Sequence, residues 1–362
     1  MENVINKQVK ELTDKLEKGI KDLFESDRYK EYLKTMSKFH NYSFNNVLLI
    51  AMQRPDASLI AGYNAWKNEH QRQVRKGEKA IKILAPAPYV IKITQDKIDP
   101  VTQKKVFDKN GKPVQEEVEV KKLAFKIVNV FDVSQTEGKE IPAIGVSELQ
   151  GNVNQYQTLF EAVKKVSPVP VGFEQIGTGA KGYYHLADKR IAINEGMSEL
   201  HNLKTLIHEI THAKLHDIDL NIPKDQINRP DRKTREVQAE SVAYVVCQHY
   251  GLDTSDYSFA YVAGWSSSQQ LGELKESLDT IRITAYGIIK EIDQNMEELQ
   301  KNQTKENRES GNSHQIKDDT CNSLSERKSN KPSVLAKLHQ KQDNINKTST
   351  FEKNVPMKEA ER

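Results

Sequence analysis

The chain has 362 residues, of which 36% are hydrophobic and 29% are charged, and its formal net charge is only +3. This length allows two domains and a tail, and so polar a composition predicts that part of the chain builds no core. The near balance of charge excludes strong bulk attraction to nucleic acid, so any such affinity must come from a local patch.

No run of the sequence approaches 18 apolar residues, so we expect neither a membrane span nor a membrane partner. The apolar residues near the N-terminus alternate with Lys and Glu at helical spacing, which is unlike a signal peptide. The two cysteines have different surroundings, with Cys247 in an apolar helix and Cys321 in a polar stretch, and they do not suggest a disulfide. We therefore expect a cytoplasmic protein.

In chain order, residues 1–135 predict an α+β domain. Apolar residues at helical spacing predict helices over 3–26 and 29–39, and a third from the N-cap Ser43 to just before Pro55. The other predicted elements are a short helix around Trp66, strands over 80–84, 89–93 and 123–131, and a charged hairpin-like insertion over 95–121 that turns at Asn110-Gly111.

A linker over 136–147 leads to a second predicted domain over 148–299. Its predicted elements are a helix over 156–166, strands over 182–186 and 189–194, two helices that carry the candidate site, and a closing helix over 269–299. An edge strand here would hold an extended peptide, although a plain core hairpin explains the pattern equally well. Residues 300–362 are polar with Phe351 as their only aromatic, which predicts a disordered tail.

The run 203–216 contains the pattern His-Glu-x-x-His, and its apolar residues recur at helical spacing. On a helix, His208 and His212 lie one turn apart on one face, so both imidazoles can bind one metal ion. Glu209 lies beside them, where its carboxylate can take a proton from a water molecule that the metal activates. The alternative is a surface helix with scattered histidines, but the helical context and an available third ligand favour a site.

A catalytic zinc needs three protein ligands and one open position. The metzincin type would need Gly at position 215 and His at 218, where this chain has Leu215 and Ile218. A second apolar helix supplies Glu236 and Glu240 four residues apart. We assign Glu236 as the third ligand and Glu240 as the acceptor of a ring N–H from a ligand histidine, while two solvated glutamates remain the alternative. His216 continues the histidine face, and we expect it in the wall of the pocket.

A basic segment lies in the first predicted domain. Between Gly62 and Lys92 seven Lys and Arg residues stand against two Glu, a local net charge of +5. The candidate DNA contacts are Arg72, Arg75, Lys76 and Lys79, with Tyr42 and Trp66 as aromatic side chains that could stack on unpaired bases. The alternative is that the aromatic residues pack the domain and that the basic loop is only a solvated face.

Four runs of the first domain carry a family resemblance: 42–46, 62–66, 72–81 and 130–136. They resemble the N-terminal single-stranded-DNA-binding domain of ArdC-type antirestriction proteins, which the related LtrC-like proteins of conjugative elements share. Residues 95–121 look like an insertion relative to that pattern.

Residues 183–265 are similar to the zinc-peptidase-like domain of the same proteins and also resemble ImmA/IrrE metallopeptidases. This resemblance implies a metal bound by His208, His212 and Glu236. Together the resemblances cover roughly residues 25–290.

The sequence therefore predicts a mobile-element, conjugation-associated antirestriction protein that binds single-stranded DNA and carries a zinc metallopeptidase domain acting on a peptide or protein. In that hydrolase Zn²⁺ would polarise the scissile carbonyl, and Glu209 would pass a proton from water to the leaving amine. Tyr261, Tyr184 and His216 are candidate donors to the developing oxyanion. One alternative is a DNA-protecting protein whose metal is only structural, and another is a conjugation accessory whose tail recruits a relaxase.

Overall fold

The computed structural model describes residues 2–24, 26–100, 102–122, 124–141, 153–177, 179–223, 229–257 and 259–311. Contacts divide the chain into two compact units, Met1–Gln300 and Lys301–Arg362. Helices and strands are mixed, which confirms the predicted α+β class. No helix among these residues is both long and apolar enough to cross a membrane.

The helices are α1 (Glu2–Leu23), α2 (Ser26–Phe39), α3 (Phe44–Gln53), α4 (Tyr63–Asn68), the 3-10 helix η1 (Val133–Gln135), α5 (Val153–Val166), α6 (Glu199–Leu215), α7 (Arg232–His249), α8 (Val262–Ser266) and α9 (Leu271–Gly311). The strands are β1 (Ile60–Gly62), β2 (Arg72–Val74), β3 (Ile81–Pro86), β4 (Tyr89–Asp96), β5 (Gln115–Lys122), β6 (Phe125–Asp132), β7 (Thr136–Gly138), β8 (Val171–Glu174), β9 (Gly182–His185) and β10 (Arg190–Asn194).

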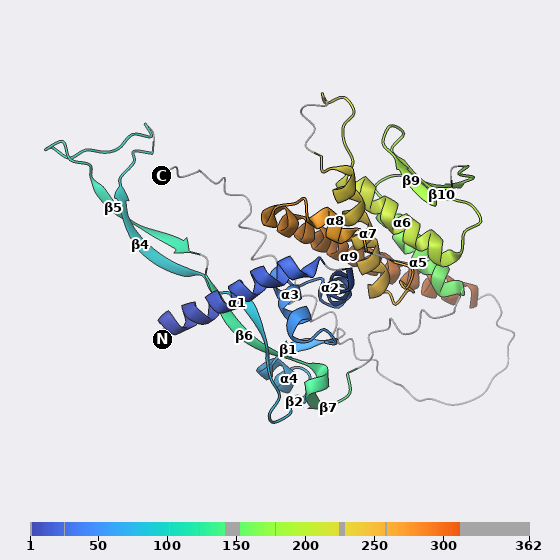
Figure 1. Ribbon diagram of the computed structural model, residues 1–362, viewed down its shortest axis with the longest axis horizontal. Coiled ribbons are helices and arrows are strands. Elements are labelled where there is room, and N and C mark those ends of the chain that lie inside the picture. Colours follow the sequence, from blue (N-terminus) through green and yellow to red (C-terminus); the bar gives the residue numbers. More distant parts are fainter. Residues whose placement is uncertain are drawn as a thin grey trace. The chain divides into compact units, whose positions relative to one another are not determined.

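A long antiparallel ribbon, to which β1 adds a third strand beside β6, is the main β element of the first 135 residues (Figure 1). β3 pairs antiparallel with β6, as in Ile81 with Val130, and β4 pairs antiparallel with β5, as in Tyr89 with Lys122. The register is the same in both pairs, and the Ala87 amide donates a 2.7 Å bond to the carbonyl opposite it at the junction. β3–β6 and β4–β5 therefore form one continuous ribbon, of which the predicted insertion is the outer part.

Helices α1, α2 and α3 build the core beside the inner part of this ribbon. α3 begins after Ser43, as predicted, and its C-cap Arg54 directly precedes Pro55, which cannot continue a helix. Its apolar run from Val47 to Ile50 is almost completely buried, and α3 packs on β3 while α1 packs on β6.

Helices α5, α6 and α7 and a three-stranded sheet carry the region of the His-Glu-x-x-His pattern. β10 lies at the centre of the sheet, parallel to β8 and antiparallel to β9, so β9 is an edge strand. α6 packs against β9, β10 and α7. Both helices that carry the candidate ligands have a side-chain N-cap. The Ser198 side chain accepts a hydrogen bond from the His201 amide, and the Asp231 side chain accepts one from the Thr234 amide.

Helix α2 packs directly on α7. The hydroxyl groups of Tyr29 and Ser241 are 2.8 Å apart and buried, and Lys30 Nζ donates a 3.1 Å bond to the Tyr257 carbonyl. Phe259 stacks edge-on against the Tyr29 ring at 5.3 Å between centroids. Residues 1–300 accordingly form one contact unit.

Short strands and one helix end depart from the prediction. β1, β2, β7 and β8 were not predicted, since strands of three or four residues leave little periodicity to detect. α9 continues to Gly311, although residues from 300 were predicted as tail, because its apolar pattern fades before the helix ends. The second half of the predicted linker, residues 142–147, and the predicted tail beyond 311 lie outside the described residues.

Candidate metal centre and basic loop

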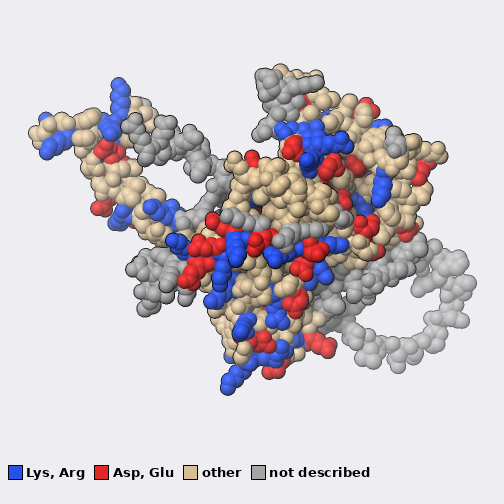
Figure 2. Space-filling view, viewed as in Figure 1, with Lys and Arg blue, Asp and Glu red and all other residues tan. Residues whose placement is uncertain are grey.

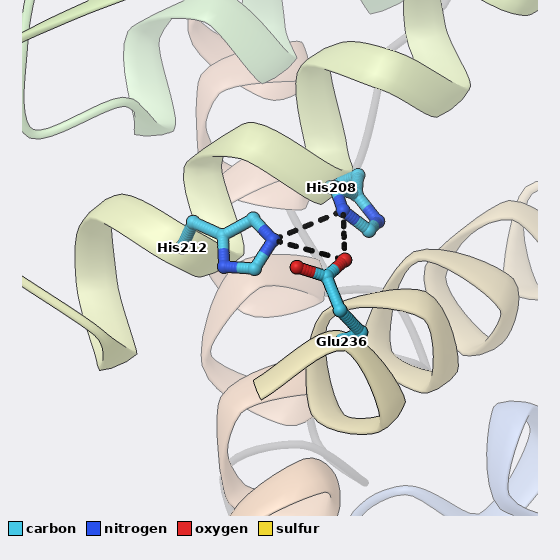
Figure 3. A group of neighbouring side chains, drawn as sticks. All are labelled: His208, His212 and Glu236. Atoms are coloured by element: carbon cyan, nitrogen blue, oxygen red, sulfur yellow. Dashed lines mark hydrogen bonds and ion pairs between the residues drawn. The ribbon is translucent and has the colours of Figure 1, made fainter. Parts of the chain in front are cut away.

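Three ligand atoms from α6 and α7 converge on one point. His208 Nε2 and His212 Nε2 are 3.0 Å apart, and Glu236 Oε2 lies 3.6 Å from the first and 3.7 Å from the second. The three side chains point toward one another across the gap between the two helices (Figure 3). The structure thus brings together the residues that the sequence predicted as metal ligands.

These separations fit a bound cation. Ligands held at about 2.0–2.1 Å from a tetrahedral metal lie roughly 3.3–3.4 Å from one another, and the observed distances of 3.0, 3.6 and 3.7 Å bracket that value. Two imidazole nitrogens and a carboxylate oxygen are also a donor set that suits divalent metals. Hydrogen bonds from the two histidines hold the pKa of the Glu236 carboxyl well below its usual range, so this ligand is ionised.

Side chains behind the ligands fix the orientation of both imidazole rings. Glu240 Oε2 lies 3.2 Å from His208 Nδ1, the position expected for an acceptor of that ring N–H. His216 Nδ1 lies 2.9 Å from His212 Nδ1, and His216 Nε2 lies 2.9 Å from the side-chain oxygen of Gln238. His216 is only 1% exposed, so it supports a ligand from within the core and does not line the pocket wall as predicted.

Glu209 is buried beside the ligands and takes no part in the three-atom cluster. Burial raises the pKa of its carboxyl, and this outweighs the opposing effect of His208 and His212. The Tyr184 amide of β9 also hydrogen-bonds to the carboxylate and fixes it against the sheet edge. A carboxylate with a raised pKa is suited to exchange a proton near neutral pH.

A cavity of about 310 Å³ opens at Glu209 and His208. Its lining also includes Gly182, where an added Cβ would lie 2.5 Å from the Thr205 methyl group and 2.8 Å from the Ala192 carbonyl oxygen. Only glycine therefore lets β9 approach α6 this closely.

Other walls of this cavity were not predicted. They include Lys204, which is nearly buried and paired with Asp256, and Tyr257, whose carbonyl accepts from Lys30 of α2. Lys204 was detectable in principle, since it precedes His208 by one helical turn and shares its face. The contribution from α2 had no signal in the sequence, because it depends on packing between distant segments.

The three candidate oxyanion donors differ in availability. The Tyr184 hydroxyl donates a 2.6 Å bond to Asp217, and both ring nitrogens of His216 have partners. Tyr261 is 45% exposed, and burial of its phenol, with a smaller effect of the Glu240 charge, raises the pKa of the phenol. Among the three candidates, Tyr261 is the one whose polar atom makes no hydrogen bond within the described residues.

The basic loop 72–79 uses its two arginines within the fold. The Arg72 guanidinium donates to the Thr136 hydroxyl at 2.7 Å, to the Thr136 carbonyl at 2.9 Å and to the Lys139 carbonyl at 2.5 Å. The Arg75 guanidinium donates to the Ser134 carbonyl at 2.6 Å and pairs with Glu78 at 2.8 Å.

Lys76 and Lys79 are exposed, and within the described residues neither side chain has a hydrogen-bond or ion-pair partner. The loop thus presents two lysines to solvent and keeps its arginines for structure.

The run 131–136 holds this loop in place. Asp132 is 1% exposed and accepts the amides of Ser58 at 2.7 Å and Ser134 at 2.8 Å. The Gln135 side chain donates to the Lys79 carbonyl at 2.8 Å. Two of the runs that carry the family resemblance therefore contact each other, and one positions the other.

The aromatic candidates for base stacking are mostly buried. Trp66 is fully buried and its indole N–H donates a 2.8 Å bond to the Phe131 carbonyl, so it packs the domain and offers no face to a base. Tyr42 packs edge-on against Phe39, and burial raises the pKa of its phenol to about 12. Tyr63 is 47% exposed, and among the accessible aromatic side chains it is the nearest in sequence to the loop 72–79.

Comparison with known proteins then assigns both halves of the chain. Residues 1–131 match the N-terminal domain of anti-restriction factor ArdC, and residues 165–250 match the IrrE N-terminal-like domain of the M78 peptidases. The chain carries both domains of an ArdC-type protein. The match to an M78 peptidase domain and the donor set of two histidines and one glutamate together indicate a divalent metal at this centre.

A relative and two solved structures extend the comparison. An uncharacterized protein of Bacillus anthracis is 30% identical over 348 residues, which cover 87% of this chain and 56% of the relative. This chain therefore spans little more than half the length of that relative.

The metal-free crystal structure of the antirestriction ArdC protein from the R388 plasmid is 22% identical, with 71% of this chain and 86% of that chain covered and a TM-score of 0.40. Its Mn(II)-bound structure is 19% identical, with 79% and 97% covered and a TM-score of 0.43.

Proposed function

We propose that this chain is a cytoplasmic antirestriction protein of a mobile, conjugative element, which binds single-stranded DNA through residues 1–135 and hydrolyses peptide bonds at a zinc centre. The observation that carries the enzymatic half is the convergence of His208, His212 and Glu236 beside the buried carboxylate of Glu209. A site that only stabilised the fold would need no such carboxylate.

The chain's own residues divide the work of hydrolysis. A divalent cation held by the three ligands would supply Lewis acidity, polarising a carbonyl and making a water molecule more acidic. Glu209 accepts the proton from the water molecule and returns it to the leaving amine. Tyr261 donates a hydrogen bond to the developing oxyanion, and the edge strand β9 aligns an extended substrate by main-chain pairing.

The DNA-binding half rests on charge and exposure. Lys76 and Lys79 are the exposed cations of the loop that have no side-chain partner within the described residues, and we assign them the phosphate contacts. Arg72 and Arg75 fix the loop, and Tyr63 supplies the exposed aromatic face. Binding of this kind is largely indifferent to sequence, as protection of incoming strands requires.

Metal analysis of four full-length proteins tests the enzymatic half. We expect about one zinc per chain in the wild type, and loss of it in His212→Ala and in Glu236→Ala because either change leaves only two ligands. Glu199→Gln, an exposed position on the same helix as His212, serves as the control and should retain the metal. Full metal content in Glu236→Ala would remove that residue from the ligand set.

The alternative of a purely structural metal makes a different prediction. In that case the wild type would hold metal yet cleave no member of a diverse peptide library, and loss of metal would lower only the thermal midpoint. Cleavage that depends on both the metal and Glu209 would exclude the structural alternative.

A further inference from the structure

The outer end of the β4–β5 hairpin is built from two small turns, over 98–105 and 107–113. The Asp99 carboxylate accepts the Thr102 amide at 2.8 Å, and the Asp108 carboxylate accepts the amides two and four residues further on at 2.8 and 2.9 Å. Both aspartates are thus engaged within their own turns, which gives the tip a defined shape.

Lysines are concentrated on these turns. The tip carries exposed Lys97, Lys104, Lys105, Lys109 and Lys112. Against them stand only Asp99 and Asp108, so the segment 97–112 has a net charge of +3 (five positive, two negative). Lys105 pairs with Asp96 at 2.8 Å, and no side-chain partner is recorded for the other four within the described residues. Figure 2 shows these basic side chains grouped at the end of the hairpin.

An exposed aromatic side chain accompanies the lysines. Phe107 is 58% exposed and Ile98 49%, although neither is needed to pack another element. An aromatic ring among uncompensated lysines is the combination that binds unpaired bases and their phosphates. Behind the tip, the paired strands carry three lysines against four carboxylates and are nearly neutral, so the positive charge of the hairpin is concentrated at the tip.

We propose that the hairpin tip, residues 97–112, is a second contact for single-stranded nucleic acid, separate from the loop 72–79. Its lysines neutralise phosphates, and Phe107 stacks on an unpaired base. The inference depends on the proposed binding of DNA by this chain, but not on which residues of the loop take part.

The two basic segments stand at opposite ends of one ribbon. The loop ends at Lys79, just before β3 begins, and the tip follows β4, so the strand from Ile81 to Asp96 separates them. At about 3.3 Å per residue this ribbon spans at most roughly 50 Å. A strand of about 8 nucleotides can occupy one contact, whereas one of about 30 nucleotides can reach both.

The test compares two triple variants of the full-length chain by fluorescence anisotropy at several salt concentrations. K104Q/K109Q/K112Q removes three tip charges, and K18Q/K164Q/K165Q removes three exposed charges from α1 and α5 as the matched control. Each protein is titrated with single strands of about 8 and about 30 nucleotides and with a duplex of the longer length.

On the longer single strand, the tip variant should flatten the log–log salt slope by about 2, at roughly 0.7 per lost phosphate contact, while the control should match the wild type. On the short strand the two variants should differ little from each other. Phe107→Ala should weaken binding to the long single strand several-fold with an unchanged salt slope, and should leave duplex binding unchanged.

Identical slopes for the tip and control variants on the long strand would overturn the inference, and would indicate that the exposed side chains of the hairpin serve a protein partner instead. Such a result would leave the proposed function intact if K76Q/K79Q still weakened binding. An equal loss for Phe107→Ala on duplex and single strand would overturn the stacking role. A deletion of 98–113 that joins the ribbon strands directly provides a second route to the same outcome, and its metal content should match the wild type.

Discussion

The metal centre and the basic loop 72–79 both come from short runs of the sequence, yet their polar side chains have opposite fates in the fold. In the metal centre, His208, His212 and Glu236 face one another. Glu240 and His216 contact the Nδ1 atoms of the two histidines, which leaves both Nε2 atoms directed at the common point. In the loop, Arg72 and Arg75 direct their donors at main-chain carbonyls. The three ligand side chains are therefore arranged to bind a cation, whereas the arginine donors are already occupied by hydrogen bonds within the protein.

The difference follows from the chemistry of the groups. When imidazole nitrogens and a carboxylate oxygen direct their lone pairs at one point, a metal cation can satisfy all of them at once. A guanidinium carries five donors in a planar fork, and carbonyl oxygens satisfy it as readily as phosphates do. A cluster of arginines in a sequence is therefore weaker evidence for a nucleic-acid surface than a histidine pair at helical spacing is for a metal.

The largest effect should follow loss of the carboxylate that is not a ligand. Glu209→Gln keeps the size and helical propensity of the residue but removes the proton acceptor, so we expect peptide hydrolysis to fall by about 10²–10⁴-fold. Metal content should stay at the wild-type level, as elemental analysis would show.

The control for that variant is Glu199→Gln, which changes an exposed carboxylate in the first turn of the same helix. Wild-type turnover by Glu209→Gln would show that the mechanism proposed above is wrong, even if the metal remained bound.

A smaller effect should follow from the residue behind a ligand. Glu240→Gln cannot attract the His208 ring N–H as strongly, so we expect the metal affinity to fall by about 10–100-fold. Competition with a chromogenic chelator measures that affinity. Glu276→Gln on α9 changes an exposed carboxylate and should leave it unchanged. An unaltered affinity in Glu240→Gln would mean that Glu240 does not orient the ligand.

Sequence patterns predicted the metal centre better than the DNA surface for a physical reason. His208, Glu209 and His212 lie on one helix, where spacing alone determines which side chains share a face. Glu236 required only the further assumption of a second helix with one buried side. The contacts that decide the fate of Arg72 come from residues 136–139, more than sixty positions away, and no local pattern reports them.

The same reasoning explains the errors in the fold. For Trp66 and Tyr42 the packing alternative holds, because Trp66 is buried and donates to the Phe131 carbonyl of β6, and Tyr42 is partly buried against Phe39 of α2. Longer helices such as α1 and α3 were predicted well because their apolar stripes extend over several turns. The contact between α2 and α7 depends on tertiary packing, so it could not be predicted from local sequence patterns.

Acid should weaken the support of the basic loop through Asp132. Burial opposes ionisation of this carboxyl, but hydrogen bonds from Ser134 and from the amides of Ser58 and Leu59 prevail and lower its pKa. A group whose pKa is lower in the folded state adds stability above its unfolded pKa of about 3.9, and this stability is lost as the pH falls through the folded value.

Asp132→Asn should therefore reduce the free energy of unfolding by roughly 1–3 kcal/mol at pH 7. The difference from the wild type should shrink below about pH 4, where the carboxyl of the unfolded wild-type chain takes up a proton, and should vanish below the lower pKa of the folded state. Chemical denaturation at pH 7 and pH 3 measures both values. Asp14→Asn, at an exposed position of α1, is the control and should show no such pH-dependent difference. An equal deficit at both pH values would remove the carboxylate charge from the explanation.

The smallest effect should separate the lysines of the loop from its arginines. In the full-length chain, K76Q/K79Q removes two exposed cations that have no recorded partner among the described residues, so we expect the log–log salt slope on a short single strand to flatten by about 1.4, at roughly 0.7 per contact. Arg75→Gln breaks the bonds to Ser134 and Glu78, so it should lower the thermal midpoint while changing the slope by much less.

The full chain is the right material, because a fragment ending at 135 would expose Tyr29, which α7 buries. K164Q/K165Q on α5 supplies the charge-matched control. If Arg75→Gln flattened the slope as much as the double lysine variant did, the guanidinium would be a phosphate contact after all, and the contrast between the two regions would disappear.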